Sequence, residues 1–340
     1  MKANDLERNA IETVVYVADN NYLWPFLVSL YTAHTNAKRE IRYILGYNVT
    51  DLSPTSISTI VQFANRMNIN LTFLPLEKIK QVEMANHVSL SAYHKLQIFD
   101  VLKEAFLYVD SDTIMCVGWD VILDGDYFSS SNIVLSAHVE HTNSSNAMSE
   151  NLAKRRSGDL YFNSGVMVVN PMRWRQLEFD KVWKGVAGDR DNLRFDLNDQ
   201  DVLNYLLPGH VKQLDAKFNY FANDLGPMEV TRSDVSNPAI IHYVGECKPW
   251  NFSESDKLFF RLLNLTSIQF SFKHGEFSWC ILHYYEEYWA TEIKVIAFVT
   301  NSSSPDLLKL LHHDRNIGSN LKVKIKTWLS GLLLKRLFGG

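Results

Sequence analysis

Apolar and polar positions alternate in blocks along the first third of the chain. Runs rich in β-branched apolar residues predict buried strands, and segments with apolar residues at helical spacing predict the helices between them. The predicted strands are residues 12–18, 41–47, 69–74 and 105–109, and the predicted helices are 22–34, 53–67 and 92–103. This alternation predicts an α/β sheet in which ligands bind beyond the carboxyl ends of the strands.

Regular alternation becomes harder to follow in the second half. Residues 240–244 are strand-like, and the polar stretch 141–158, which precedes residues 160–170, is long for a loop in a compact domain, as lids and acceptor sites often are. Beyond Trp250 we predict a small, mainly helical C-terminal appendage.

The last twenty positions, 321–340, differ in composition from the rest of the chain. They hold lysines and one arginine among leucines and other apolar residues, with no acidic residue. Such a basic amphipathic segment is typical of one lying on an anionic membrane surface. The alternative is a terminal helix docked on the domain with a solvated basic edge. The predicted organisation is therefore a main domain at 1–252, an appendage at 253–320 and a membrane-associating tail at 321–340.

Composition excludes several classes of protein. The chain has 340 residues, of which 46% are hydrophobic and 21% charged, with a formal net charge of −4. That balance is ordinary for a globular protein and does not favour nucleic-acid binding. The three cysteines are scattered and lack metal-site spacing, which is typical of reduced thiols. We find neither a secretory signal nor a membrane-spanning run, so we expect a cytoplasmic protein.

The most informative motif is Asp110-Ser111-Asp112, which ends the predicted strand 105–109. Side chains at i and i+2 of a strand point the same way, so the two carboxylates are expected to face one ligand. Hard oxygen ligands suit Mg²⁺ or Mn²⁺, and such an ion would also hold a diphosphate. Taken alone, the motif is equally compatible with two aspartates that cap a turn.

Three further clusters contain candidate binding residues. Asp19, Asn21 and Tyr22 follow the first predicted strand, where a nucleotide would dock and Tyr22 would offer a ring for stacking, although ordinary turn chemistry is the better explanation of this cluster taken alone. The second cluster combines 162–166 with the acidic and amide residues of 198–203, which would either grip sugar hydroxyls or cap a helix.

The third cluster is the string His242-Tyr243-Val244-Gly245-Glu246-Cys247-Lys248-Pro249-Trp250. His242 would add an imidazole to the metal site, and Lys248 would place a positive charge on a phosphate. Gly245 would let the backbone approach that phosphate closely. The alternative is a core histidine followed by a turn.

Together these motifs resemble glycosyltransferase family 8. The matching patterns are Ala-Asp-x-Asn-Tyr, Asp-x-Asp, Phe-Asn-x-Gly-Val, Asp-Gln-Asp-Val-Leu-Asn and His-x-x-Gly-x-x-Lys-Pro-Trp, in family order over about residues 12–250. The resemblance is closest to bacterial lipopolysaccharide and lipooligosaccharide galactosyl- and glucosyltransferases. It implies a GT-A-type, Rossmann-like mixed sheet with flanking helices that binds a nucleotide sugar.

The resemblance also assigns roles to individual residues. It implies Mn²⁺, or Mg²⁺ in its place, on Asp110, Asp112 and His242. Uridine would be held by Asp19, Asn21 and Tyr22, and phosphate by Gly245 and Lys248. Lys95 stands where relatives carry arginine, so it keeps the charge without the planar fork. Asn163, Asp199 and Gln200 would contact the donor sugar.

The implied activity is the transfer of glucose or galactose from a UDP-sugar to a glycan, with an α-linkage as product. The acceptor implied is the core of lipopolysaccharide or lipooligosaccharide, at the inner face of the cell membrane. Gln200 and Asp201 are the candidate groups beneath the sugar ring, and because an amide is a poor nucleophile we favour a short-lived ion pair.

Two other functions compete with this one. A phosphatase would carry Asp-x-Asp on its first strand, whereas here the motif follows the fourth. A catalytically inactive nucleotide- or glycan-binding protein of the same fold is the other alternative, and the complete set of three metal ligands argues against it. The acceptor side departs from the family, because His138, Val139 and Glu140 stand where relatives often place an acid.

Overall fold

The computed structural model divides the chain into two compact units, residues 1–244 and 245–340. It describes residues 11–79, 91–128, 130–139, 161–189, 193, 195, 197–222, 237–245, 248–252, 257, 271–272, 275–276 and 279–300. The polar stretch 141–158, Glu140 and the tail 321–340 lie outside the described residues. The predicted boundary between main domain and appendage, at residue 252, stays a prediction.

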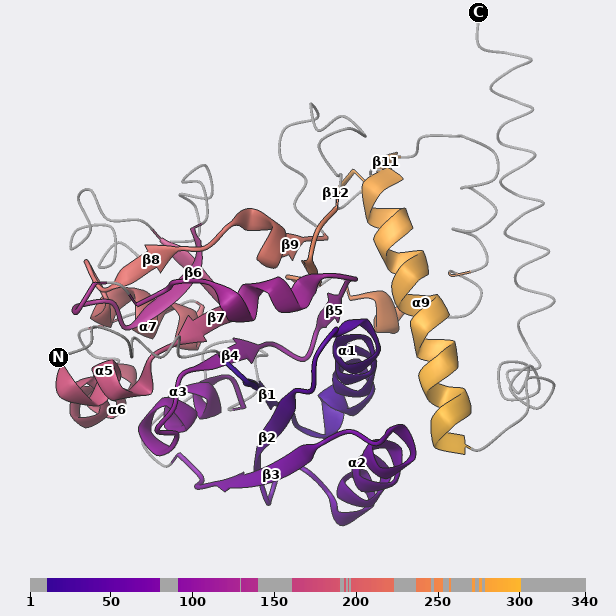
Figure 1. Cartoon of the computed structure of the whole chain (residues 1–340), viewed down its shortest axis with the longest axis horizontal. Coiled ribbons are helices and arrows are strands. Elements are labelled where there is room, and N and C mark those ends of the chain that lie inside the picture. The colour runs from indigo at the N-terminus through magenta and orange to yellow at the C-terminus, as the bar shows by residue number, and fades with distance from the viewer. Residues whose placement is uncertain are drawn as a thin grey trace, which may run out of the picture. The chain divides into compact units, whose positions relative to one another are not determined.

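The first unit contains one large sheet, one small sheet and helices on both faces of the large sheet (Figure 1). The strands of the large sheet are β1 (Thr13–Val17), β2 (Arg42–Asn48), β3 (Leu71–Leu76), β4 (Phe106–Val109), β6 (Leu135–Val139), β7 (Phe162–Val169) and β8 (Val211–Gln213). The small sheet comprises β5 (Thr113–Met115), β9 (Tyr220–Phe221) and β10 (Ile240–His242). The helices are α1 (Leu23–Asn36), α2 (Pro54–Met67), α3 (Ser91–Val101), α5 (Pro171–Gln176), α6 (Phe179–Gly188) and α7 (Asn198–Leu206).

Each predicted strand and helix of the first third forms, with its ends shifted by three residues at most. Helix α2 begins as its sequence predicts, because Ser53 Oγ accepts a hydrogen bond from Ser56 N at 3.1 Å and Pro54 occupies the first turn. The helix ends at Asn68, whose φ of 53° is a left-handed conformation that asparagine tolerates.

The large sheet is mixed, with the strand order β3-β2-β1-β4-β7-β6-β8. Strands β3, β2, β1 and β4 run parallel, as the strand–helix alternation predicts, but β7 runs antiparallel to β4. The start of β7 therefore lies beside the carboxyl end of β4, and Asp110 N donates to Gly165 O at 2.7 Å. Because β7 is antiparallel to β4, the motif 162–166 at the start of β7 lies next to Asp110, which follows β4.

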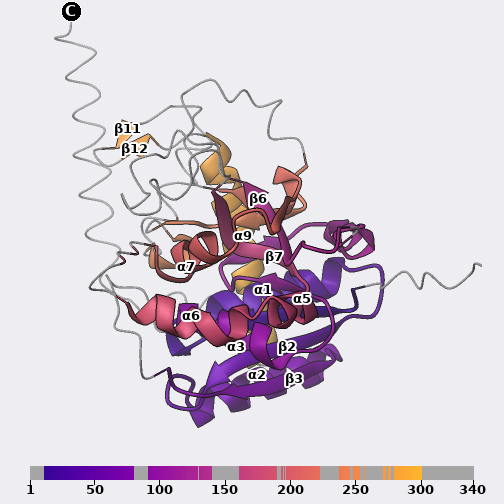
Figure 2. The same cartoon turned by 90° about the vertical axis from the view of Figure 1, so that its left-hand side faces the viewer.

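Successive residues of β1 face opposite layers of the unit, as alternation along a strand requires. Tyr16 packs edge-on against Phe26 of α1, with ring centroids 5.4 Å apart. Val15 and Val17 instead belong to a hydrophobic cluster on the other face, together with Leu96 of α3. The helices α3, α5, α6 and α7 gather on that face, as Figure 2 shows.

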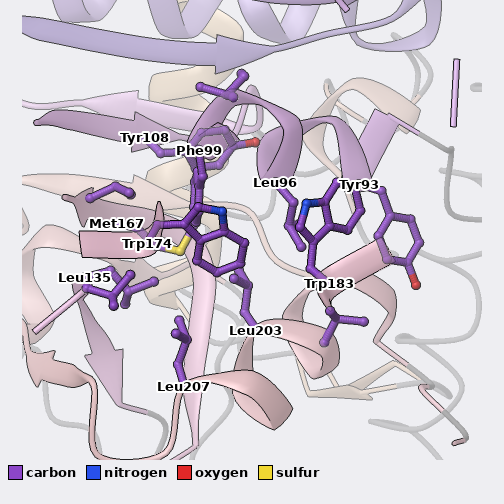
Figure 3. Packing of buried hydrophobic residues seen from close by; sticks show 14 of the residues in the cluster. Tyr93, Leu96, Phe99, Tyr108, Leu135, Met167, Trp174, Trp183, Leu203 and Leu207 are labelled. Carbon is purple, nitrogen blue, oxygen red and sulfur yellow. The ribbon is translucent and has the colours of Figure 1, made fainter. Parts of the chain in front are cut away.

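The cluster on the α3 face includes the indoles of Trp174 and Trp183 (Figure 3), and one acid, Asp100, accepts a hydrogen bond from each. Trp174 Nε1 donates to Asp100 Oδ1 at 2.8 Å, and Trp183 Nε1 donates to Asp100 Oδ2 at 3.0 Å. Buried indole N–H groups need acceptors, and this one carboxylate serves both. Asp100 thus ties α3 to α5 and α6, and burial raises the pKa of its carboxyl group.

The second unit contributes the helix α9 (Trp279–Thr300) and the two-residue strands β11 (Ser271–Phe272) and β12 (Gly275–Glu276). Within this unit Trp289 Nε1 donates to Pro249 O at 2.7 Å. None of the helices in the described part of the chain has the length and apolar character needed to cross a membrane.

Candidate functional site

Asp110 and Asp112 lie in the turn between β4 and β5, past the end of the strand that was expected to align them. They converge nonetheless, because the turn is fixed at both ends. Ser111 Oγ donates to Val17 O at 2.8 Å, and Thr113 Oγ1 donates to Asp110 O at 3.0 Å. Ligand atoms of Asp110, Asp112 and His242 all lie within 4.8 Å of one another. The predicted group of Asp110, Asp112 and His242, called the triad below, therefore forms. Its two aspartates are aligned by a turn rather than by alternation along a strand.

His242 reaches the aspartates because β10 pairs with β5. The antiparallel register sets His242 opposite Thr113, and Tyr243 N donates to Asp112 O at 2.9 Å. His242 Nε2 then lies 3.3 Å from Asp112 Oδ1 and 3.9 Å from Asp110 Oδ2. The imidazole rests on Gly165, where a Cβ atom would approach His242 Cε1 to 2.1 Å. Glycine at position 165 is thus required by the histidine of the metal triad.

Lys95 is buried beneath the triad, with 4% of its side chain exposed. Its Nζ lies 3.2 Å from Asp110 Oδ1 and 2.8 Å from Asp199 Oδ2. Burial lowers the pKa of this ammonium, but the attraction of Asp110 and Asp199 outweighs that effect, so the pKa lies above its ordinary value. Lys95 therefore stays protonated and links the metal triad to α7.

Residues at the start of β7 and of α7 form one buried polar group. Gln200 Oε1 accepts from Asn163 Nδ2 at 3.0 Å and from Ser164 N at 3.2 Å. Ser164 Oγ donates to Asp199 Oδ2 at 2.9 Å. Asn163, Asp199 and Gln200, which the sequence assigns to donor-sugar binding, are thus brought together beside Lys95.

Asp201 occupies a different position from its neighbours on α7. Its Oδ1 accepts from Tyr161 OH at 2.6 Å, its Oδ2 accepts from Leu197 N at 2.9 Å, and the residue is fully buried. A carboxylate engaged at both oxygens in this way stabilises the start of α7, as the capping interpretation of this motif predicts.

The loop after β1 combines local capping with proximity to the triad. Asp19 Oδ1 accepts from Asn21 N at 2.9 Å and from Tyr22 N at 3.1 Å, which is the turn chemistry weighed for this motif. Burial raises the pKa of the Tyr22 hydroxyl, and the negative charges of Asp112 and Asp110 raise it further. Tyr22 therefore lies near the triad, and the Asn21 side chain is exposed.

Gly245 and Lys248 belong to the second unit. Gly245 has a φ of 74°, a left-handed conformation that glycine adopts without steric cost. Lys248 Nζ lies 5.7 Å from the centroid of the Trp250 ring, within cation–π range. Their predicted contacts with phosphate stay a prediction.

Sequence reasoning missed two residues that belong to the buried polar group of Asn163 and Gln200. Asn219 is only 1% exposed; its Oδ1 lies 2.9 Å from His242 Nδ1, and its Nδ2 donates to Asn163 Oδ1 at 2.9 Å. Tyr161 precedes the β7 motif and accepts from Gln200 Nε2 at 3.0 Å. An asparagine between two aromatic residues has no distinguishing pattern, whereas Tyr161 adjoins a motif that was already of interest.

The donor set suits a hard divalent cation. Two carboxylates and one imidazole supply oxygen and nitrogen ligands. Asp110, Asp112 and Asp199 are three carboxylates in this region, where Lys95 supplies one ammonium that pairs with Asp110 and Asp199. That excess of negative charge would be neutralised by a divalent ion, so the residues fit Mn²⁺ or Mg²⁺.

Comparisons with known proteins agree with this geometry. The lipopolysaccharide 1,2-glucosyltransferase of Escherichia coli is 25% identical over 267 residues, which is 74% of this chain and 78% of that protein. General stress protein A of Bacillus subtilis (strain 168) is 24% identical over 269 residues, covering 72% and 90%. The solved galactosyltransferase LgtC, in complex with donor and acceptor sugar analogues, superposes with a TM-score of 0.60 at 20% identity, covering 82% of this chain and 95% of that one.

The LgtC similarity shows that the fold is GT-A, as the sequence predicts. Residues 13–254, more than half of the chain, match the family model described as glycosyl transferase family 8. This match includes the triad, Lys95 and the α7 cluster. The chain therefore belongs to glycosyl transferase family 8 and is a glycosyltransferase.

Proposed function

We propose that this glycosyltransferase moves glucose or galactose from a UDP-sugar to a glycan, with retention of configuration and an α-linkage in the product. The acceptor proposed is the core of lipopolysaccharide or lipooligosaccharide. The observation that carries the proposal is the convergence of Asp110, Asp112 and His242 next to the buried group of Asp199 and Gln200. The relatives named lipopolysaccharide glucosyltransferases support the class of acceptor.

Asp110, Asp112 and His242 would hold Mn²⁺, or Mg²⁺ in its place. When bound, such an ion acts as a Lewis acid that stabilises charge on a departing diphosphate. The protein supplies the rest of the electrostatic environment. Lys95 keeps Asp110 and Asp199 in place, and Lys248 is proposed to add a positive charge at the phosphates.

We propose roles in donor binding for several residues. Asp19, Asn21 and Tyr22 are proposed to bind uridine, with Gly245 at the phosphates. Asn163, Asp199 and Gln200 are proposed to bind the sugar. The Gln200 amide is held from both ends, by Ser164 N and by Tyr161 OH, so it presents a fixed face to the ring.

For the transfer itself we propose a short-lived ion pair. As the bond from the anomeric carbon to the UDP oxygen breaks, the acceptor hydroxyl attacks the face that UDP leaves, and its proton passes to the departing phosphate. Gln200 stabilises the positive ring through the dipole of its amide, whose oxygen also accepts from Asn163 Nδ2 and Ser164 N. Asp201, engaged at both oxygens, positions α7 in this scheme.

UDP release from a panel of UDP-sugars tests the proposed function. With Mn²⁺ present, turnover is expected with UDP-glucose or UDP-galactose, and EDTA is expected to abolish it. Adding truncated lipopolysaccharide core as acceptor is expected to increase the rate, and the anomeric configuration of the product can be read by NMR. Donor binding without turnover for any sugar and acceptor would instead indicate an inactive binding protein of the same fold.

Replacing Gln200 with alanine tests its role beneath the sugar ring. The change removes the amide that faces the ring and leaves the triad intact, so turnover is expected to fall by about 10²–10³-fold, the loss typical of one transition-state contact. Steady-state kinetics should show the loss mainly in kcat. Near-normal turnover in this variant would exclude a catalytic role for Gln200.

The tail 321–340 is proposed to bind the anionic inner face of the cell membrane. Truncation after residue 320 is expected to abolish co-sedimentation with vesicles containing phosphatidylglycerol, because the basic and apolar residues leave together. The full-length chain with vesicles of phosphatidylcholine alone serves as the control for charge. Equal sedimentation of truncated and full-length protein would contradict the proposal and favour a tail docked on its own domain.

A further inference from the structure

Asn219 lies between a residue of the metal triad and a residue of the proposed sugar site. It is buried in the turn before β9, where its two side-chain atoms contact His242 and Asn163. We propose that Asn219 is a positioning residue that fixes the tautomer of His242 and couples it to Asn163. The part of the proposal that concerns the metal rests on the proposed function.

The direction of each hydrogen bond follows from two backbone donors. An amide side chain can be placed either way round, but a backbone N–H can only donate. Gly165 N contacts Asn163 at 2.8 Å, so the atom it meets is the amide oxygen of Asn163. Ser164 N likewise meets Gln200 at 3.2 Å, which makes that atom Oε1 and the facing atom of Asn163 its NH₂ group.

The orientation of Asn163 also determines which ring nitrogen of His242 carries a proton. Because the oxygen of Asn163 is an acceptor, Asn219 must present its NH₂ group to it, at 2.9 Å. The remaining atom of Asn219 is then its oxygen, which lies 2.9 Å from His242 Nδ1. Nδ1 must therefore carry the proton, and in the neutral ring Nε2 carries the lone pair.

The other ring nitrogen of His242, Nε2, faces the carboxylate of Asp112, with Oδ1 at 3.3 Å. With the proton on Nδ1, the lone pair of Nε2 is directed toward the position where a cation would lie between the carboxylates. The other tautomer would place an N–H group there, which would donate to Asp112 and compete with a metal. Second-sphere acceptors of this kind commonly fix a ligating histidine.

Two variants separate the two contacts of Asn219. Asn219→Asp keeps an acceptor for His242 Nδ1 but replaces the amide donor that faces Asn163 Oδ1 with a carboxylate oxygen. Asn219→Leu, of similar size, removes both contacts. Ser136→Ala is the control, because Ser136 is buried in β6 and its hydroxyl has no hydrogen-bond partner among the described residues.

The first readout is the tautomer of His242 in the metal-free, full-length protein. Long-range ¹⁵N–¹H NMR on ¹⁵N-histidine protein, assigned with a His242→Gln sample, should show that Nδ1 carries a proton. The same result is expected in Asn219→Asp and Ser136→Ala, and a partly protonated Nδ1 in Asn219→Leu. An unprotonated Nδ1 in the wild-type protein would overturn the proposal without any variant.

The second readout is Mn²⁺ affinity, measured from the EPR signal of free Mn²⁺. Asn219→Leu is expected to bind Mn²⁺ about 10–100-fold more weakly, the usual effect of losing a second-sphere partner. Asn219→Asp is expected to keep the affinity while its KM for the UDP-sugar rises, because Asn163 is disturbed. Unchanged affinity in Asn219→Leu would overturn the coupling. If the wild-type protein has the expected tautomer but binds no Mn²⁺, the positioning role stands and the proposed metal function fails.

Discussion

Replacement of Asp112 by asparagine is expected to reduce metal-dependent release of UDP by about 10³-fold, corresponding to the several kcal/mol that a Lewis-acidic ion contributes. Asparagine keeps the volume of the side chain but removes a negative charge next to His242. The backbone of residue 112 still accepts from Tyr243 N, so the turn between β4 and β5 should persist. The loss should therefore be one of metal binding, seen by EPR as free Mn²⁺, with an unchanged melting temperature.

Asp126→Asn is the matched control for this experiment. Asp126 is exposed on the same unit and lies outside the triad, so its neutralisation makes the same change in net charge. Its turnover and Mn²⁺ binding should equal those of the wild-type protein. Full metal-dependent turnover in Asp112→Asn would mean that the triad does not hold the catalytic ion.

Replacement of Gly165 by alanine is expected to remove Mn²⁺ binding through a purely steric effect. The added Cβ would lie 2.1 Å from His242 Cε1 and 2.7 Å from Nδ1, so the ring must move. Moving it disrupts the bond to Asn219 and withdraws Nε2 from the aspartates. Overpacking of a buried site should also cost about 1–3 kcal/mol in the free energy of unfolding, measurable by urea denaturation.

Gly185→Ala is the matched control for this second substitution. Gly185 lies within α6, and a Cβ atom there meets no other atom within 4 Å. Alanine should stabilise the helix by about 0.5–1 kcal/mol and leave Mn²⁺ binding unchanged. If Gly165→Ala bound Mn²⁺ with wild-type affinity, the close packing of His242 on residue 165 would not govern the site.

The local sequence pattern predicts that Asp110 and Asp112 belong to a site, but it does not predict the contacts that bring them together. Their types and their place after an apolar strand predict a metal site, and Asp110, Asp112 and His242 do lie together. The route was wrong, because the aspartates lie in a turn rather than on one face of a strand. Their convergence depends on contacts with Val17 O and on the pairing of β10 with β5, which join segments distant in sequence.

The position of the motif 162–166, at the start of β7, also depends on contacts that the local sequence does not reveal. The cluster of residues 162–166 and 198–203 is equally compatible with sugar binding and with helix capping, and ligand-binding residues of a parallel α/β sheet were expected to follow strands. In this chain residues 162–166 begin a strand, and they lie near the triad because β7 runs antiparallel to β4. Strand direction is decided by the long connection and by packing in three dimensions, so a run of apolar residues does not reveal it.

Features that depend on near neighbours along the chain could be predicted from the sequence. Alternating apolar runs, the Ser53 cap and the ordered motifs sufficed for the α/β elements of the first third, the family and the group of Asp110, Asp112 and His242. The folded structure was needed to show that Lys95 is a buried counter-ion of Asp110 and Asp199 and that Asn219 lies against His242. Both roles arise from contacts across different strands and helices, where burial and hydrogen-bond direction exist only once the chain has folded.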